Sequence, residues 1–558
     1  MIERTGGQLL TEALARQGVR MIFGIPGVQL DELADALYAA GDRISFVCAR
    51  NEQATTYMAN GYARSTGAVG VAMVVPGPGV LNALTGLATA FATNSRVLLL
   101  AGQIDSRAMG KGYGALHEIP DQTGMLQRLT KWTGTARRAD GIPGLVSRAF
   151  SEMHSGRPRP VALEVPPDVL ASTTTATVDG HARPMPVAPD EADVERAAAL
   201  LRASSRPVIY AGGGVLAASP GAALALRELA EALEAPVLVS ENGRGAIDAR
   251  HRLAFDALAL RAFRADADVV LGAGTRFLTT FGRQLDIGSA SLVLLNADPA
   301  DLGAPRQAAA TICADADPGL RALADAVGRP PRASRASEFQ RVRVWLDRCF
   351  ADIAPQREYL AAIRSALPDD GIFVSEYTQV GYAASACFPT YHPHGYIGPG
   401  YQGTLGFGFA TALGAKAAGP SHAVLSVTGD GGFSWTMQEL STAKRYSIGL
   451  VTVLFNDGYY GNVRRIQKHR YGGRYFASDL TNPDYRMLAE AFGISYARAH
   501  DPATLTGVLR EALPAGEPAL IEVPVGEFPS PWHLIHERIP GRALIDTDAH
   551  KRPIRSRA

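Results

Sequence analysis

The sequence lacks several features that mark particular classes of protein. It has four cysteines among 558 residues and no CxxC pair, which argues against a cysteine-based metal site and fits a reducing cytoplasm. Its 55 Lys and Arg nearly cancel its 54 Asp and Glu, so no bulk charge attracts nucleic acid or an anionic membrane. No stretch approaches about 18 uninterrupted apolar residues, and the N-terminal MIERTGGQLLTEAL lacks the apolar core of a signal peptide. We therefore expect a cytoplasmic protein without nucleic-acid or membrane partners.

The length and two segments without periodic apolar positions indicate several domains. A chain of 558 residues is too long for one hydrophobic core. Residues 171–190 are rich in Thr, Ala and Pro, and residues 328–337 are basic and rich in Pro, as is typical of linkers. We expect three domains, at about 1–170, 190–327 and 340–558.

Within each predicted domain, short runs of β-branched and aliphatic residues alternate with amphipathic helical patterns. Several of the runs end in glycine, as strands do where they turn into helices in α/β proteins. The runs occupy residues 69–75, 96–102, 206–214, 267–274, 423–431 and 450–457. The pattern predicts three doubly wound α/β domains, each with a parallel sheet.

The first and third predicted domains share a pattern. PVALEVP at 160–166 closes the first and PALIEVP at 518–524 closes the third. Upstream of each, a strand enters a glycine-rich turn, at 75–79 and at 428–431, and the offset from turn to closing strand is similar. Two independent α/β domains with generic strands would explain this. We prefer a structural duplication with another α/β domain between its halves.

A glycine-rich turn and an asparagine in the third domain carry the strongest chemical signal. The turn consists of Gly429, Asp430, Gly431 and Gly432. Glycines let the backbone approach a phosphate, and the following helix presents unpaired N–H groups. Asn456 ends the next strand, 26 residues after Asp430, about the length of one βαβ unit. Asp430, Asn456 and the Gly458 carbonyl would give Mg²⁺ three ligands and leave positions for diphosphate oxygens. The alternative is an ordinary turn in which Asp430 only caps a helix.

Four segments, in order and spacing, resemble the thiamine-diphosphate (ThDP) enzymes, in particular their acetolactate synthase-like branch. They are residues 18–33, 49–90, 401–418 and the segment from Asp430 to Asn456. The resemblance covers nearly the whole chain and implies ThDP and Mg²⁺ as cofactors. It also implies pyrimidine-binding, central and diphosphate-binding domains in that order. Active sites would then lie between the subunits of a homodimer or homotetramer.

The resemblance assigns residues to the cofactor. Glu52, between the strand at 44–49 and a helix, would hydrogen-bond the pyrimidine N1′ and share its proton. The Gly403 carbonyl would accept the 4′-amino group, and Leu405, where the synthases usually have Met, would wedge between the two rings. Tyr459 would also contact the cofactor. The simpler interpretations are an exposed Glu in a first helical turn and an ordinary core Leu.

Further residues are assigned to catalysis and substrate. His117 stands where the synthases usually have Gln, and it would donate to a developing alkoxide or shuttle a proton, unless it is a structural histidine. The residues expected to line the substrate mouth are Val28, Gln29, Lys131, Arg465 and Ile466. A basic funnel suits a 2-oxo acid, although a charged run is more often a solvated helix face.

The chain departs from the synthases in several places. Ile466 replaces the Trp that discriminates between acceptor oxo acids. The flavin-binding run of the central domain reads Arg276-Phe-Leu-Thr-Thr280, without its two acidic residues and its second Arg. Where the synthases usually have Gly-Met-His-Gly near the flavin, this chain has Phe255-Asp-Ala-Leu258. Where they have Asp-Val-Gly-Gln-His-Gln at the diphosphate, it has Tyr377-Thr-Gln-Val-Gly381. These differences argue against FAD and leave the product unassigned.

Three functions therefore stay open. The first is a 2-oxo acid carboligase or decarboxylase of the acetolactate synthase type. The second is a lyase or hydrolase that cleaves a 2-hydroxy ketone, a diketone or a 2-hydroxyacyl-CoA. It is favoured by residues 50–53 and Asn94, which resemble 2-hydroxyacyl-CoA lyases and oxalyl-CoA decarboxylases. The third is a catalytically silent ThDP-fold protein with a binding or regulatory role, and the intact Glu52, Asp430 and Asn456 argue against it.

Overall fold

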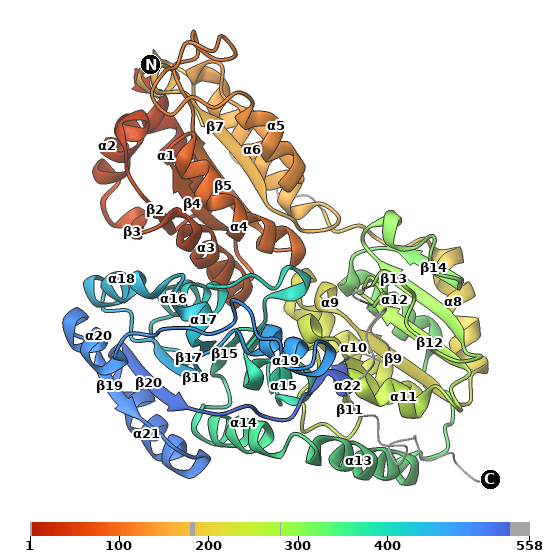
Figure 1. The fold of residues 1–558 in the computed structure, drawn as a ribbon. Coiled ribbons are helices and arrows are strands. Elements are labelled where there is room, and N and C mark those ends of the chain that lie inside the picture. The colour runs from red at the N-terminus through yellow and green to blue at the C-terminus, as the bar shows by residue number, and fades with distance from the viewer. Residues whose placement is uncertain (1–2, 179–184, 280, 536–558) are drawn as a thin grey trace.

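Three α/β lobes make up the computed structural model, which describes residues 3–178, 185–279 and 281–535 (Figure 1). Each lobe is built on a sheet of six strands, all parallel. This confirms the predicted fold class. In the part of the chain that is described, no helix is long and apolar enough to cross a bilayer. Residues 179–184 of the first predicted linker lie outside the described residues.

The N-terminal lobe orders its strands β3-β2-β4-β5-β7-β6. The strands are β2 (Met21–Gly24), β3 (Ser45–Cys48), β4 (Gly70–Val74), β5 (Val97–Gly102), β6 (Trp132–Thr135) and β7 (Val161–Val165). The helices are α1 (Gly6–Arg16), α2 (Asp31–Ala39), α3 (Glu52–Thr66), α4 (Pro78–Ala92), α5 (Gln122–Leu129), α6 (Ile142–His154) and α7 (Pro167–Ala171). A short antiparallel ribbon joins β1 (Arg4–Thr5) to β8 (Thr173–Thr174).

Successive side chains of a strand point to opposite faces of this sheet, and helices cover both faces. Val71 and Met73 pack toward α1 and α6, whereas Ala72 and Val74 pack toward α3 and α4. Every residue of β4 and β5 is buried, as expected for a parallel sheet between two helical layers. These strands are therefore apolar at successive positions, without the alternation of apolar and polar residues seen when one face is exposed.

The central lobe orders its strands β11-β10-β9-β12-β13-β14. The strands are β9 (Pro207–Ala211), β10 (Val237–Val239), β11 (Ala254–Asp256), β12 (Val269–Ala273), β13 (Ser291–Asn296) and β14 (Ala308–Cys313). The helices are α8 (Glu191–Ala203), α9 (Gly213–Ala218), α10 (Pro220–Leu233), α11 (Leu260–Phe263) and α12 (Ala316–Val327). The strand order reverses between β9 and β12, the position where open α/β sheets bind ligands.

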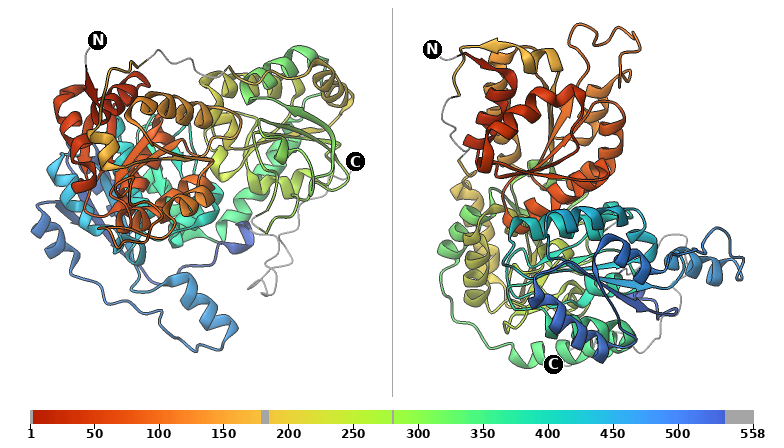
Figure 2. Two further views of the ribbon diagram at one scale, coloured as in Figure 1. Left: turned by 90° about the horizontal axis from the view of Figure 1, so that it is seen from above. Right: turned by 90° about the vertical axis from the view of Figure 1, so that its left-hand side faces the viewer.

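The C-terminal lobe orders its strands β16-β15-β17-β18-β20-β19. The strands are β15 (Ile372–Ser375), β16 (Tyr396–Ile397), β17 (Val424–Gly429), β18 (Val451–Asn456), β19 (Ser495–Arg498) and β20 (Ala519–Pro524). The helices are α13 (Ala336–Ala351), α14 (Ala354–Ala366), α15 (Gln379–Cys387), α16 (Phe407–Ala418), α17 (Asp430–Phe433), α18 (Leu440–Arg445), α19 (Gly461–Arg470), α20 (Tyr485–Phe492), α21 (Pro502–Ala515) and α22 (Trp532–Ile535). Helix α19 and the chain after it project from this lobe (Figure 2).

The first and third sheets have the same topology. Numbered along the chain within each lobe, both run second, first, third, fourth, sixth, fifth across the sheet, whereas the central sheet does not. The closing segments PVALEVP and PALIEVP supply β7 and β20, which occupy the same place in their sheets. The structure therefore agrees with the predicted duplication.

Close packing of two helices joins the N- and C-terminal lobes. An added Cβ at Gly61 of α3 would lie 1.9 Å from the Thr411 carbonyl oxygen of α16. An added Cβ at Gly414 would lie 1.9 Å from the carbonyl oxygen of Met58. Only glycine allows the two backbones to approach this closely. The contact places the first residue of α3, Glu52, beside the C-terminal lobe.

Candidate functional site

Two oxygen ligands converge at the carboxyl ends of β17 and β18. The Asn482 side-chain nitrogen donates to Asp430 Oδ2 at 2.7 Å and to Asn456 Oδ1 at 3.0 Å. Asp430 is 2% exposed, and burial raises the pKa of its carboxyl. A buried carboxylate and an amide oxygen that meet at one point suit a hard cation, which would favour the ionised Asp430. The residues present therefore fit Mg²⁺.

Glu522 and Asn482 belong to this site, and no motif in the sequence pointed to them. The Asn456 side-chain nitrogen donates to Glu522 Oε1 at 2.8 Å, which turns the Asn456 oxygen toward Asp430. Glu522 lies on β20 beside β18, and its other oxygen accepts from the Tyr496 hydroxyl at 2.5 Å. Such outer contacts set the orientation of metal ligands. The one feature of the sequence that could have indicated Glu522 was its place in PALIEVP, the closing segment that resembles PVALEVP of the first domain.

The turn after β18 supports the same position. Gly458 has a φ of +74°, and its N–H donates to Asp430 Oδ2 at 2.9 Å. The Gly458 carbonyl, a predicted cation ligand, accepts from the Leu480 N–H at 2.9 Å and keeps a second lone pair. Burial, and then the charge of Asp430, raise the pKa of Asp457 to about 6. The helix that follows Gly429 at the glycine-rich turn, α17, is a single turn.

Glu52 opens α3 at the carboxyl edge of the first sheet. Asn51 caps the helix by accepting the Gln53 N–H at 2.8 Å. The half-buried Glu52 carboxylate accepts from the Asn82 side chain of α4 at 3.0 Å through Oε2. An added Cβ at Gly79 would lie 3.6 Å from Oε1, so this glycine keeps space open beside the carboxylate. Asn82 was not predicted from the sequence.

The loop that carries His117 reaches this edge as well. Gln29, which is buried, donates to the Leu116 carbonyl at 3.2 Å, while Val28 is 63% exposed. His117 has a φ of +68°, and its carbonyl oxygen would lie 2.3 Å from a Cβ at Gly77. Its buried ring Nδ1 has no hydrogen-bond partner among the described residues. An unpartnered ring nitrogen is available for a bound molecule.

The segment before α16 holds an apolar side chain in reach of solvent. Gly403 has a φ of +58°, and a Cβ there would lie 3.0 Å from the Tyr377 ring. The Leu405 side chain is 37% exposed. Its carbonyl accepts from Gln53 Nε2 and from the Tyr57 hydroxyl, both at 3.4 Å. The backbone is thus anchored while the Leu405 side chain remains accessible.

Lys131 does not join these residues within the chain. It precedes β6, at the amino edge of the sheet, opposite the edge of Glu52. Its ammonium donates to the carbonyls of Glu152 at 2.7 Å and Arg157 at 3.1 Å, and to the carbonyl of Ser155. These carbonyls hold the ammonium at the end of α6, and the place of Lys131 at a substrate mouth between subunits stays a prediction.

Arg465, which was predicted to line the substrate mouth, is hydrogen-bonded within the C-terminal lobe. It is 5% exposed, and one guanidinium nitrogen donates to Gln379 Oε1 at 3.1 Å and to the Phe528 carbonyl at 2.6 Å. Glu527 lies 3.7 Å away. Within the chain, Arg465 therefore fastens the segment around Phe528 to the lobe, while its neighbour Ile466 is half-buried. The roles of both residues toward a substrate stay predictions.

Tyr459 takes part in a stack on the projecting segment. The Arg464 guanidinium lies 3.9 Å from the Tyr459 ring and 4.0 Å from the Tyr475 ring, and it forms an ion pair with Asp479. The Tyr459 side chain is 39% exposed. These two cation–π contacts hold Tyr475, in the loop after α19, against the turn that carries Tyr459 and Gly458.

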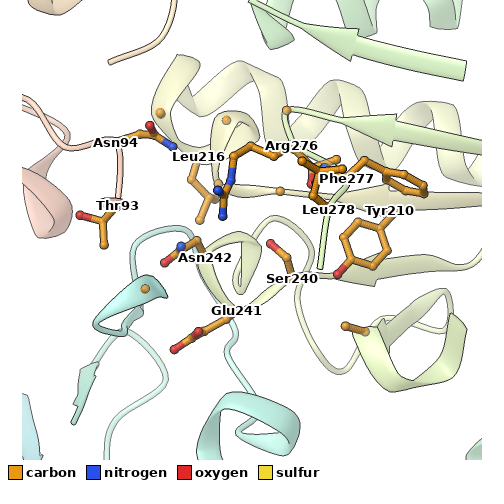
Figure 3. Close-up of a pocket in the computed structure, with 18 of the residues that line it drawn as sticks. Thr93, Asn94, Tyr210, Leu216, Ser240, Glu241, Asn242, Arg276, Phe277 and Leu278 are labelled. Atoms are coloured by element: carbon orange, nitrogen blue, oxygen red, sulfur yellow. The ribbon is translucent and has the colours of Figure 1, made fainter. Parts of the chain in front are cut away.

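A cavity of about 990 Å³ lies in the central lobe, where this lobe meets the other two (Figure 3). Its lining includes Ser240, Glu241 and Asn242 after β10 and Arg276 after β12. Figure 3 shows Arg276 reaching into this space, and its guanidinium lies 4.7 Å from the Tyr401 ring. The cavity lies at the reversal of strand order, so its position fits a ligand site.

The residues at this cavity do not fit FAD, and we expect the purified protein to carry little or none. Leu278 and Thr279 line it where the flavin-binding run has acidic residues. Asp256, in the segment that replaces Gly-Met-His-Gly, forms a 2.8 Å ion pair with the buried Arg244 and is not available to a ligand. Visible absorbance of the purified protein, and of the supernatant after denaturation, measures bound flavin. About one flavin per chain would contradict this prediction.

The matches to known protein families divide the chain in the same way as the three lobes do. Family models described as the N-terminal, central and C-terminal domains of thiamine pyrophosphate enzymes match residues 4–125, 194–323 and 377–523. A probable 2-ketoarginine decarboxylase of Pseudomonas aeruginosa is 34% identical, over 93% of this chain and 94% of its own length. The acetolactate synthase isozyme 3 large subunit of Escherichia coli is 32% identical, over 91% and 92% of the two chains. A probable acetolactate synthase large subunit of Methanocaldococcus jannaschii is also 32% identical, over 93% and 91%.

The three matched domains occur in the order of the three lobes, and the relatives cover nearly the full length of the chain. Thiamine pyrophosphate is another name for ThDP, whose diphosphate the glycine-rich turn was expected to bind. On these matches, the chain belongs to the thiamine pyrophosphate enzyme family.

Proposed function

We propose that this chain is a ThDP- and Mg²⁺-dependent enzyme that decarboxylates a 2-oxo acid and joins the remaining fragment to a carbonyl acceptor. The observation that supports it most directly is that a side-chain oxygen of Asp430 and one of Asn456 lie within hydrogen-bond distance of the same Asn482 nitrogen. Relatives named as acetolactate synthases and as a 2-oxo acid decarboxylase support the reaction class.

Each part of the cofactor would be held by a different segment. Asp430, Asn456 and the Gly458 carbonyl would hold Mg²⁺, and the glycine-rich turn would face the diphosphate. Gly403 and Leu405 would hold the two rings. When bound, ThDP supplies a carbon nucleophile and an electron sink for the breaking and forming of carbon–carbon bonds.

The protein's own groups would hold and move protons. Glu52 would share a proton with the pyrimidine N1′, and the Asn82 hydrogen bond keeps its carboxylate in one orientation. The unpartnered Nδ1 of His117 would exchange a proton with the oxygen of the substrate. Both groups lie at the carboxyl edge of the first sheet, which supports a shared site.

We further propose a homodimer or homotetramer in which Glu52 of one chain serves the Asp430 site of another. Within one chain the hydrogen bonds of Glu52 go to Asn82 and those of Asp430 to Gly458 and Asn482. Large apolar side chains near both regions are exposed, including Leu81, Leu405 and Trp435. A second chain would cover them. The cysteines form no disulfide, which supports a cytoplasmic location.

An assay with ThDP and Mg²⁺ tests the reaction class. Pyruvate and longer 2-oxo acids would be compared with 2-hydroxy ketones, a diketone and a 2-hydroxyacyl-CoA, with detection of CO₂ and of condensed products. We expect CO₂ from 2-oxo acids. Cleavage of the hydroxy ketone or acyl-CoA without activity on any oxo acid would support the lyase alternative. Tight ThDP binding without any turnover would support the silent protein.

A decarboxylase for a 2-oxo acid with a cationic tail is a second candidate. Arg464 forms an ion pair with Asp479, and Glu527 lies 3.7 Å from Arg465, so acidic side chains offset part of the positive charge at this edge. The relative named as a 2-ketoarginine decarboxylase would act on such a substrate. Comparison of kcat/KM for pyruvate and for a 2-oxo acid with a guanidinium group distinguishes the candidates.

We expect the protein to be a poor acetohydroxybutyrate synthase because Ile466 replaces a Trp. An Ile is smaller and branched, so it cannot offer the flat surface that would hold the ethyl group of 2-oxobutyrate. One methylene in an apolar pocket is worth about 1–3 kcal/mol, or roughly 10- to 200-fold in preference. Pyruvate supplied with equal 2-oxobutyrate, followed by measurement of both products, decides this. A strong preference for the 2-oxobutyrate product would show that another group replaces the Trp.

A further inference from the structure

Glu376 is a buried carboxylate between two segments of the proposed cofactor site. It directly follows β15 and is 2% exposed. Its Oε1 accepts the Gly406 N–H at 2.8 Å, and its Oε2 accepts the hydroxyl of Thr428. Both of these partners are uncharged.

The contacts with the first segment have the character of a helix cap. The backbone N–H groups of Gly406, Phe407 and Gly408 all point at the Glu376 carboxylate. At the start of α16 these N–H groups have no acceptor within the helix, and the N-cap residue Gly406 has no side chain that could accept them. A carboxylate at this position is stabilised by the helix dipole. Glu376 therefore caps α16 from another element and determines where the segment before it runs.

Glycines surround Glu376 on several sides. An added Cβ at Gly408 would lie 2.8 Å from the Glu376 Cβ, and one at Gly432 would lie 2.4 Å from Oε1. Within α15, a Cβ at Gly381 would lie 1.7 Å from the Glu376 carbonyl oxygen. Gly408 of α16 and Gly432 of α17 therefore leave space for the Glu376 side chain, and Gly381 of α15 leaves space for its backbone. Burial raises the pKa of Glu376 to about 7.

The two partners of Glu376 adjoin different parts of the proposed site. Gly406 directly follows Leu405, in the segment assigned to the rings of ThDP. Thr428 directly precedes Gly429, in the turn assigned to the diphosphate. Gly406 and Thr428 bond different oxygens of the same carboxylate. A shift of either segment would therefore strain the hydrogen bond to the other segment.

We propose that Glu376 is a positioning residue that holds the ring-binding segment and the diphosphate-binding turn at a fixed spacing before ThDP binds. The inference rests on the proposed placement of ThDP at these segments. Segments that are already ordered lose less conformational freedom when a ligand binds, so the affinity for ThDP is higher. Glu376 itself does not touch the reacting atoms.

Two substitutions test the role with matched chemistry. Glu376→Leu removes both acceptors, and ThDP affinity in the presence of Mg²⁺ should fall roughly 10- to 100-fold, as for other outer contacts of metal sites. Glu376→Gln keeps an oxygen for Gly406 and offers its amide to the Thr428 oxygen, so it should restore affinity close to the wild-type value. Calorimetric titration with ThDP measures both.

Hydrogen exchange of the cofactor-free protein supplies a readout independent of activity. Peptides over 403–408 and 428–433 should exchange faster in Glu376→Leu than in wild type and in Glu376→Gln. Asp268→Ala is the control, because Asp268 ties the N–H groups of Ser205 and Arg206 in the central lobe, away from both segments. It should leave exchange of both peptides unchanged.

Several outcomes would overturn the proposal. One is wild-type ThDP affinity and unchanged exchange in Glu376→Leu, and another is an equal loss of affinity in Asp268→Ala. If Glu376→Leu does not fold, Thr428→Val removes one of the two contacts and should weaken ThDP binding while exposing 428–433. Full ThDP occupancy in a variant that carries both Asp430→Ala and Asn456→Ala, with Glu376 unchanged, would instead overturn the proposed placement of the cofactor.

Discussion

Glu52→Gln is expected to bind ThDP normally and to lose turnover by about 10²- to 10⁴-fold, the usual scale for removal of a proton-transfer group. The substituted side chain keeps an oxygen for Asn82, which now bonds Glu52 at 3.0 Å, so the shape of the site is preserved. An amide, however, cannot share a proton with the pyrimidine nitrogen. Steady-state turnover and the rate of exchange of the ThDP C2 proton, followed by NMR, measure the effect.

A control for this variant is a carboxylate in the same lobe with a similar local position. Asp31 lies in the first turn of α2 and is exposed. Asp31→Asn removes one negative charge from a helix N-terminus, as Glu52→Gln does, but it should leave turnover unchanged. Near-normal turnover of Glu52→Gln, with wild-type exchange of the C2 proton, would show that Glu52 has no catalytic role.

Asp430→Ala and Asn456→Ala are each expected to lose ThDP at low Mg²⁺. In the proposed site the protein supplies three cation ligands, and loss of one hard ligand weakens such a site strongly. Asp430→Ala also removes the acceptor for Gly458 and Asn482, so the turn after β18 loses its anchor. Gel filtration in the presence of EDTA, followed by measurement of ThDP per chain, reports retention.

The dependence on Mg²⁺ distinguishes a lost ligand from a damaged fold. Raised Mg²⁺ should restore part of the ThDP bound to Asn456→Ala, because the remaining ligands still converge. Asp484→Ala is the neighbouring control, since Asp484 caps α20 through the Met487 N–H and has no proposed contact with the cation. Full ThDP occupancy of both ligand variants after EDTA treatment would rule out the metal assignment.

The apolar runs and glycine-rich turns determined much of the fold from the sequence alone. Runs such as 423–431 and 450–457 became β17 and β18, and Asp430 and Asn456 lie at their carboxyl ends. These features are predictable because strand and turn propensities are local, and because the carboxyl ends of parallel strands share one edge. The same logic placed Glu52 correctly at the end of a strand and the start of a helix.

Only the tertiary structure decided which polar side chains face the site. Lys131 and Arg465 belong to patterns typical of a basic funnel, and within the chain they donate to the carbonyls of Arg157 and Phe528, which no local pattern indicated. Asn482 and Glu376 have no motif, yet the fold brings each between two segments of the site. A side chain's direction depends on partners far away in the chain, and local sequence carries no record of those partners. The physical reason is that a buried polar group must be satisfied by whichever donors and acceptors the packed lobes bring within reach.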